Sequence, residues 1–152
     1  VTDPTESTST TTGALLVNGG VGIGGNAWVE GRVTSESVKI ADTVFDSTLI
    51  LVNTTATTVV DSYSIDEFRS AKYLIQIDEG SGAGAEFQVI EILLLVDNAG
   101  TVYATEYAVL GSNGELGEFA ADVQMDNIVR LYFAPYYPTD KVIKVLRIGM
   151  SV

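Results

Sequence analysis

The chain has 152 residues, 46% of them hydrophobic, a composition that suits one globular domain with an appendage and not a disordered tail. Twenty acidic against eight basic residues give a formal charge of −12, which opposes binding to nucleic acid and to anionic membranes. Cysteine and histidine are absent, which excludes disulfides, thiolate nucleophiles and histidine bases and leaves carboxylates, tyrosines and lysines as the residues for any catalysis.

Residues 1–12 are polar and rich in threonine, a composition that predicts a linker. The chain begins at Val1 without a signal-peptide pattern, which is consistent with a fragment or a trimmed chain. The longest apolar run, Ile92 to Val96, is far shorter than the roughly 20 residues that a membrane-spanning helix needs, so we expect no membrane insertion.

The sequence of residues 13–47 predicts a glycine-rich β stem. Seven glycines stand between Gly13 and Gly31 and separate very short apolar strands that have too little side-chain bulk to form a core alone. Copies of the same chain that wind around one axis would bury these strands, so the pattern predicts an intertwined oligomer. The side chains expected to make the contacts between copies are those of Leu15, Val17, Val21, Ile23 and Trp28.

The glycines of the stem also match a nucleotide-binding pattern. Gly20, Gly22 and Gly25 have the GxGxxG spacing, but that motif holds a pyrophosphate only where it leads into a helix. Here residues 26–31 continue as a predicted strand, so we interpret the glycines as tight turns and points of close approach between chains. No cofactor is expected.

Residues 48–152 predict a head with the fold of a jelly-roll-like β-sandwich. Between Ala71 and Asp78 apolar and polar residues alternate with period two, as on a strand with one face on a core and one in water. The segment from Glu86 to Val96 is apolar on both faces, so we expect a subunit contact to cover its second face. The eight predicted strands are residues 49–53, 57–63, 71–78, 86–97, 101–110, 116–123, 127–135 and 141–150.

Three turns are predicted in the head. The sequence Asp97-Asn98-Ala99-Gly100 predicts a hairpin, and residues 111–114 predict a second reversal. Residues 64–70 predict a single helical turn, with Ser64 as the N-cap of a capping box.

Acidic residues in the loops could supply oxygen ligands to calcium, but none of them forms a calcium-binding motif, so no metal site is predicted. A glycosidase with two carboxylates stays open as an alternative, because its acids can lie far apart in a sequence. Charged residues inside the strands predict pairs across a sheet. These residues are Glu91, Glu106, Arg130, Lys144 and Arg147.

An aromatic cluster lies near two prolines. Tyr132, Tyr136 and Tyr137 are predicted to form a contact surface, since exposed tyrosines beside a loop shaped by proline can stack on sugar rings or face another protein. The alternative interpretation is an aromatic rim that closes the sandwich.

The segment from Thr11 to Asn26, TTGALLVNGGVGIGGN, resembles a motif of virion structural and tail-fibre proteins of tailed bacteriophages, especially contractile-tailed phages of marine cyanobacteria. In the head, FRSAKYLIQID from Phe68 to Asp78 and the short segments 87–89 and 105–107 also resemble a domain of those proteins. The resemblance implies a trimeric virion appendage and carries over no catalytic residue.

Together these observations predict a non-enzymatic piece of a phage tail fibre or virion appendage, a homotrimer located in the virion. Its expected partners are copies of itself, other virion proteins and a host-surface glycan or protein. The alternatives are a depolymerase-like tip with paired carboxylates and a purely structural virion adaptor.

Overall fold

The computed structural model describes residues 8–152. The chain divides into two units, Val1–Thr34 and Ser35–Val152. The predicted polar linker, residues 1–12, lies outside the described residues as far as residue 7.

The second unit is all-β, as predicted. No α-helix occurs among residues 8–152, and none of these residues forms a helix long and apolar enough to cross a membrane. The elements are β1 (Ser37–Ile40), β2 (Thr43–Val52), β3 (Thr58–Ser64), β4 (Phe68–Glu79), the short 3-10 helix η1 (Gly82–Gly84), β5 (Glu86–Val96), β6 (Val102–Gly111), β7 (Gly117–Val123), β8 (Ile128–Pro135) and β9 (Lys141–Ser151).

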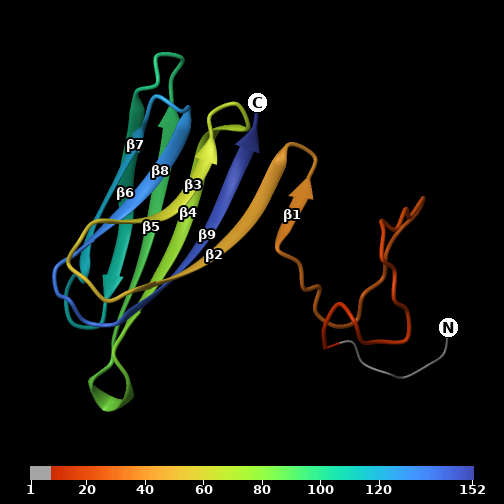
Figure 1. The fold of residues 1–152 in the computed structure, drawn as a ribbon, viewed down its shortest axis with the longest axis horizontal. Helices are drawn as coiled ribbons and strands as arrows, with labels where there is room; N and C mark the ends of the chain where they lie inside the picture. Colours follow the sequence, from red (N-terminus) through yellow and green to blue (C-terminus); the bar gives the residue numbers. More distant parts are fainter. Residues whose placement is uncertain (1–7) are drawn as a thin grey trace. The chain divides into compact units, whose positions relative to one another are not determined.

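The strands form two antiparallel sheets that pack together (Figure 1). The larger sheet has six strands in the order β1-β2-β9-β4-β5-β6, and the smaller has three in the order β3-β8-β7. The predicted sandwich is therefore confirmed in its broad form, with an unequal division of strands between the sheets. Strand β9 lies between β2 and β4 and joins the two halves of the larger sheet.

The core lies between the sheets and follows the predicted alternation. Tyr73, Ile75 and Ile77 of β4 are fully buried, while Leu74 between them is exposed. The smaller sheet contributes Val129 and Phe133 of β8 to the same core. Burial of each such side chain contributes roughly 1.5–3 kcal/mol, so this layer of side chains holds the two sheets together.

The two predicted chain reversals are confirmed. Asp97 Oδ1 accepts the backbone N–H groups of Ala99 and Thr101, and Gly100 has a φ of 79°. The prediction of a helical turn at 64–70 is wrong, because β3 and β4 are joined there by a tight turn. Ser64 Oγ accepts the N–H of Asp66, a local bond that stabilises a turn as readily as a helix start.

In the first unit, residues 8–34 contain no strand, so the short strands predicted at 14–17 and 26–31 are absent from the single chain. A strand needs a partner for its backbone hydrogen bonds, and the structure holds one copy of the chain. The predicted stem extended to residue 47, but its last part lies in β1 and β2 of the larger sheet. Whether residues 13–34 form an intertwined stem stays a prediction.

Candidate functional site

Four places in the second unit are candidate sites. They are the outer face of the smaller sheet, a groove beside Arg147, a second groove at the end of the larger sheet, and the outer face of the larger sheet. The two outer faces are built from the alternation of their strands, which sends every second side chain away from the core.

The outer face of the smaller sheet brings together two of the three predicted contact tyrosines. Tyr132 Oη donates to Asp122 Oδ1 at 3.0 Å, and Tyr136 Oη donates to Glu118 Oε1 at 3.0 Å. Both acids point outward from β7. We call this surface the acid–tyrosine face; it is formed by Glu118, Asp122, Asp126, Arg130, Tyr132 and Tyr136.

The acid–tyrosine face is polar and acidic. Desolvation and the bond to Asp122 raise the pKa of Tyr132, and the bond to Glu118 together with desolvation raises that of Tyr136. Both hydroxyls therefore stay protonated at neutral pH. The rings present flat surfaces beside carboxylates, an arrangement that can stack on a sugar and accept its hydroxyl hydrogen bonds.

Tyr137 lies beyond the end of β8 and is 61% exposed. Its carbonyl accepts a 2.8 Å hydrogen bond from the ammonium of Lys141, which is buried and also pairs with Glu79. Lys141 thus fixes the loop that presents Tyr137. The alternation of β9 places Lys141 on the core side, a position that the sequence analysis did not interpret.

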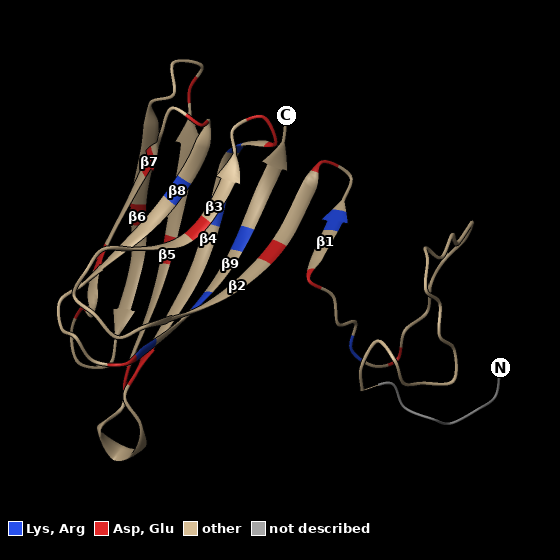
Figure 2. Cartoon of the chain, viewed as in Figure 1, with Lys and Arg blue, Asp and Glu red and all other residues tan. Residues whose placement is uncertain are grey.

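A groove of about 330 Å³ is lined by Asp46 of β2, Asp61 of β3 and Arg147 of β9. Figure 2 shows a basic position in the middle of β9 flanked by acidic positions on β2 and β3. Arg147 Nη1 lies 2.8 Å from Asp61 Oδ2, and Nη2 lies 2.7 Å from Asp46 Oδ2. Arg147 pairs across the sheet with Asp46, its register partner on β2, as predicted. It does not lie at the surface, however, because Arg147 is 5% exposed and faces the space between the sheets.

Aromatic rings surround the same guanidinium. It lies 5.1 Å from the ring centroid of Tyr63 and 5.4 Å from that of Phe68. Tyr73 Oη donates to Asp61 Oδ2 at 3.0 Å. Burial raises the pKa of Asp61 above its ordinary value, although Arg147 and Tyr73 lower it. Because both carboxylates are engaged by Arg147, the cluster is arranged to join the sheets rather than to transfer protons.

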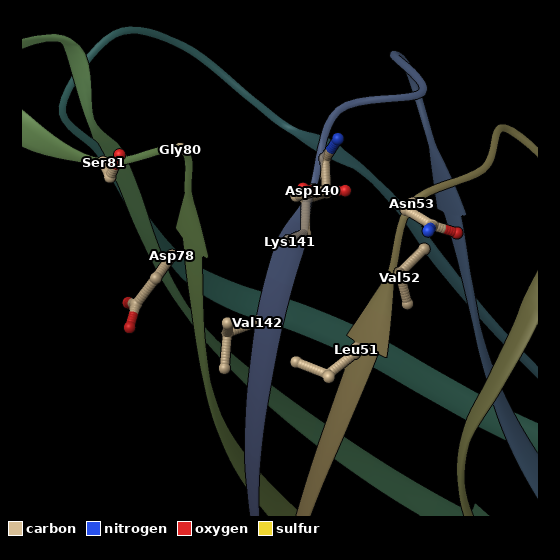
Figure 3. A pocket seen from close by; sticks show the side chains of 9 residues that line it. All are labelled: Leu51, Val52, Asn53, Asp78, Gly80, Ser81, Asp140, Lys141 and Val142. Atoms are coloured by element: carbon tan, nitrogen blue, oxygen red, sulfur yellow. The ribbon is translucent and has the colours of Figure 1, made fainter.

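A second groove, of about 560 Å³, lies at the end of the larger sheet (Figure 3). Its carboxylates, Asp78 and Asp140, point in different directions (Figure 3). Asp78 is held by Gln76 and Lys144, and these bonds keep its pKa below the ordinary value. Within residues 8–152 no group of three or more acidic side chains is placed to hold a metal ion.

The outer face of the larger sheet is apolar over five of its strands. We call it the outer apolar face; its exposed members are Leu49, Leu51, Leu74, Phe87, Leu93, Leu95, Tyr103, Leu110 and Met150. Its charged residues on these strands form two ion pairs, Lys72 with Glu91 and Lys144 with Asp78. The sequence predicted that residues 86–96 have a second apolar face covered by a subunit contact. In the single chain that face is exposed, and it continues onto the neighbouring strands.

In the first unit, the five predicted stem contacts are all exposed. The exposed fractions run from 48% for Val17 to 94% for Trp28, and Leu15, Val21 and Ile23 lie between these values. The GxGxxG glycines are followed by no helix in residues 26–34.

No protein-family model and no curated protein matches this chain. Among solved structures, the tailspike protein of Acinetobacter phage vB_ApiP_P1 is similar over 90% of this chain, with 12% identity and a TM-score of 0.42. Tailspike protein gp49 of Acinetobacter baumannii bacteriophage Fri1, described as a capsular polysaccharide depolymerase, is similar over 75% of it, with 15% identity and a TM-score of 0.45. The chain spans 26% and 19% of the lengths of these two proteins, and neither comes from a marine cyanophage.

Proposed function

We propose that this chain is a non-enzymatic structural piece of a phage tail fibre or related virion appendage. It assembles as a homotrimer through residues 13–34 and displays the second unit as a head. The proposal rests on the resemblance of residues 11–26 to phage tail-fibre proteins and on the exposure of this segment in the single chain.

The observation that carries the proposal is that every large apolar side chain in residues 8–34 is exposed by about half or more. All eight of them are exposed; they are Leu15, Leu16, Val17, Val21, Ile23, Trp28, Val29 and Val33. Soluble monomers rarely leave so many apolar residues uncovered in one segment. Copies of the same segment, wound together, would remove them from water.

The glycines of the segment support the same conclusion. A Cβ placed on Gly20, Gly22 or Gly25 would meet no atom within 4 Å, and none of the three has a positive φ. Neither local conformation nor packing of the single chain therefore requires glycine at these positions. Close approach of a second backbone does require it.

Sedimentation equilibrium of the full chain tests the assembly. Three copies of 16.1 kDa correspond to about 48 kDa, and we expect this mass at micromolar concentrations. Val21→Asp should shift the mass toward the monomer, because it buries a charge between copies. Asn18→Asp, in the same segment, adds the same charge at a position outside the apolar set and should leave the mass unchanged. A chain that stays monomeric at the highest attainable concentration contradicts the proposal.

The receptor contact is proposed at the acid–tyrosine face and Tyr137. On an array of host-surface glycans, binding by the full chain should weaken with Tyr137→Ala and Tyr132→Phe. Thr55→Ala, in the exposed loop between β2 and β3, should leave it unchanged. A blank array for the unmodified chain favours the alternative of an adaptor that contacts virion proteins alone. New reducing ends released from capsular polysaccharide would favour the depolymerase alternative and overturn the non-enzymatic assignment.

A further inference from the structure

The outer apolar face is large enough to be an interface. The face is formed by five neighbouring strands spaced about 4.8 Å apart, so it is about 24 Å wide. Each strand has about ten residues with a rise of about 3.3 Å per residue, which gives a length of about 33 Å and an area of roughly 800 Å². A specific interface of standard size buries about 800 Å² on each partner. Single exposed apolar residues need no explanation, but nine of them on neighbouring strands of one sheet face mark a contact.

The charges on this face limit what can cover it. Lys72 Nζ lies 3.1 Å from Glu91 Oε2, and Lys144 pairs with Asp78, so the two cations and two anions cancel within the face. The whole chain carries −12, and this charge repels any second copy that approaches through an acidic surface. A neutral apolar face avoids that repulsion.

The outer face of the other sheet has the opposite character. On the acid–tyrosine face, Glu118, Asp122 and Asp126 stand against one cation, Arg130. Two copies that met through this face would bring like charges together. Of the two sheet faces, the outer apolar face is therefore the one that a second copy can cover.

We infer that the outer apolar face packs against another copy of this chain, so that the heads contact one another directly in the assembly. This inference rests on the proposed function, because a stem of wound copies holds the heads at high effective concentration and makes an additional apolar contact favourable. The heads then turn their acid–tyrosine faces outward.

Because the chain has no cysteine, one introduced cysteine is the only thiol, and its labelling rate reports its exposure. Leu93→Cys places the thiol on the outer apolar face, where Leu93 is 48% exposed in the single chain. Ala120→Cys places it on an exposed position of β7, on the acid–tyrosine face, as the matched control. In the assembled chain we expect a maleimide to label Leu93→Cys at least tenfold more slowly than Ala120→Cys.

The protection must depend on assembly. Adding Val21→Asp to Leu93→Cys should restore fast labelling, and a bifunctional maleimide should cross-link assembled Leu93→Cys chains but not Ala120→Cys chains. Leu49→Cys, on β2 of the same face, provides a second position if Leu93→Cys disturbs folding as judged by circular dichroism.

Each other outcome overturns the inference in a recognisable way. If Leu93→Cys and Ala120→Cys are labelled at equal rates in an assembly of about 48 kDa, the outer apolar face is exposed in the assembly. The proposed trimer then stands, but its heads do not contact one another. Slow labelling in a chain that sedimentation shows to be monomeric means that the chain's own residues cover the face. Fast labelling in such a monomer removes both this inference and the proposed assembly.

Discussion

Arg147 of the larger sheet reaches across the sandwich to Asp61 of the smaller sheet, with 2.8 Å between Nη1 and Oδ2. Both side chains are nearly buried, with 7% and 9% of their surfaces exposed. The pair therefore joins the two layers at a place where both residues have little contact with water.

Arg147→Ala should destabilise the fold by about 3–5 kcal/mol, because it leaves the buried carboxylate of Asp61 without its cation. It also removes the guanidinium that stacks on Tyr63 and Phe68. Urea unfolding at a fixed chain concentration measures the change. Arg130→Ala breaks a more exposed ion pair with Asp126 and should cost much less stability, because exposed ion pairs contribute little. Equal losses in the two variants would show that burial of Arg147 is unimportant.

Gly149→Ala should destabilise the head by about 1–3 kcal/mol through overpacking. A Cβ at position 149 would lie 2.8 Å from Cδ1 of the Phe68 ring, which is itself 1% exposed and cannot move into solvent. Gly84→Ala is the control, since its Cβ meets no atom within 4 Å. Thermal unfolding should give a lower midpoint temperature for Gly149→Ala than for Gly84→Ala. Equal midpoints in the two variants would contradict the close packing of Phe68 against Gly149.

Arg130 holds the pKa of Asp126 at about 2, against an ordinary value of 3.8, chiefly through its hydrogen bond. A lowered folded-state pKa means that ionised Asp126 stabilises the fold above its ordinary pKa, and this contribution is lost as the pH falls toward 2. Asp126→Asn should therefore make stability less dependent on pH between about pH 4 and pH 2.

The same pair can be tested from its other side by carbon-13 NMR titration. Arg130→Gln should move the pKa of Asp126 back toward 3.8. If the pKa of Asp126 is unchanged in this variant, a group other than Arg130 lowers it.

Trp28 is the only tryptophan and is 94% exposed in the single chain, so its fluorescence reports directly on the stem. Its emission maximum should shift to shorter wavelength, and acrylamide should quench it less, as concentration drives assembly. Val21→Asp should abolish both changes, whereas Asn18→Asp should retain them. If the assembly has a mass of about 48 kDa, three times 16.1 kDa, but its emission is still that of a fully exposed tryptophan, Trp28 makes no contact between copies.

The sequence predicted the strands of the head well, because their signals are local. Period-two alternation identified β4, and Asp97 with Gly100 identified the hairpin after β5. The sequence missed the buried role of Arg147, since its partners Asp61 and Asp46 lie 86 and 101 positions away in the chain. No local pattern reports such a pairing.

The beginning of the head was also misplaced, for a related reason. Asp46 and Ser47 interrupt the apolar pattern of β2, so the predicted strand began only at residue 49. In the structure Asp46 lies opposite Arg147 on the neighbouring strand β9. The ion pair between them stabilises a charged side chain at this position of β2. The tyrosines were grouped because they are close in sequence, whereas the acids that bind two of them come from β7 and no local pattern links the two strands. That these tyrosines form a contact surface stays a prediction.

The position of β9 has a consequence for synthesis on the ribosome. Because β9 leaves the ribosome after the other eight strands, β2 and β4 have edges without a partner until it arrives. Such edges are prone to pair with neighbouring chains, and pairing between distant segments is slow. A nascent chain is therefore most exposed to misassembly before β9 has been translated, when a chaperone or rapid docking of β9 would matter most.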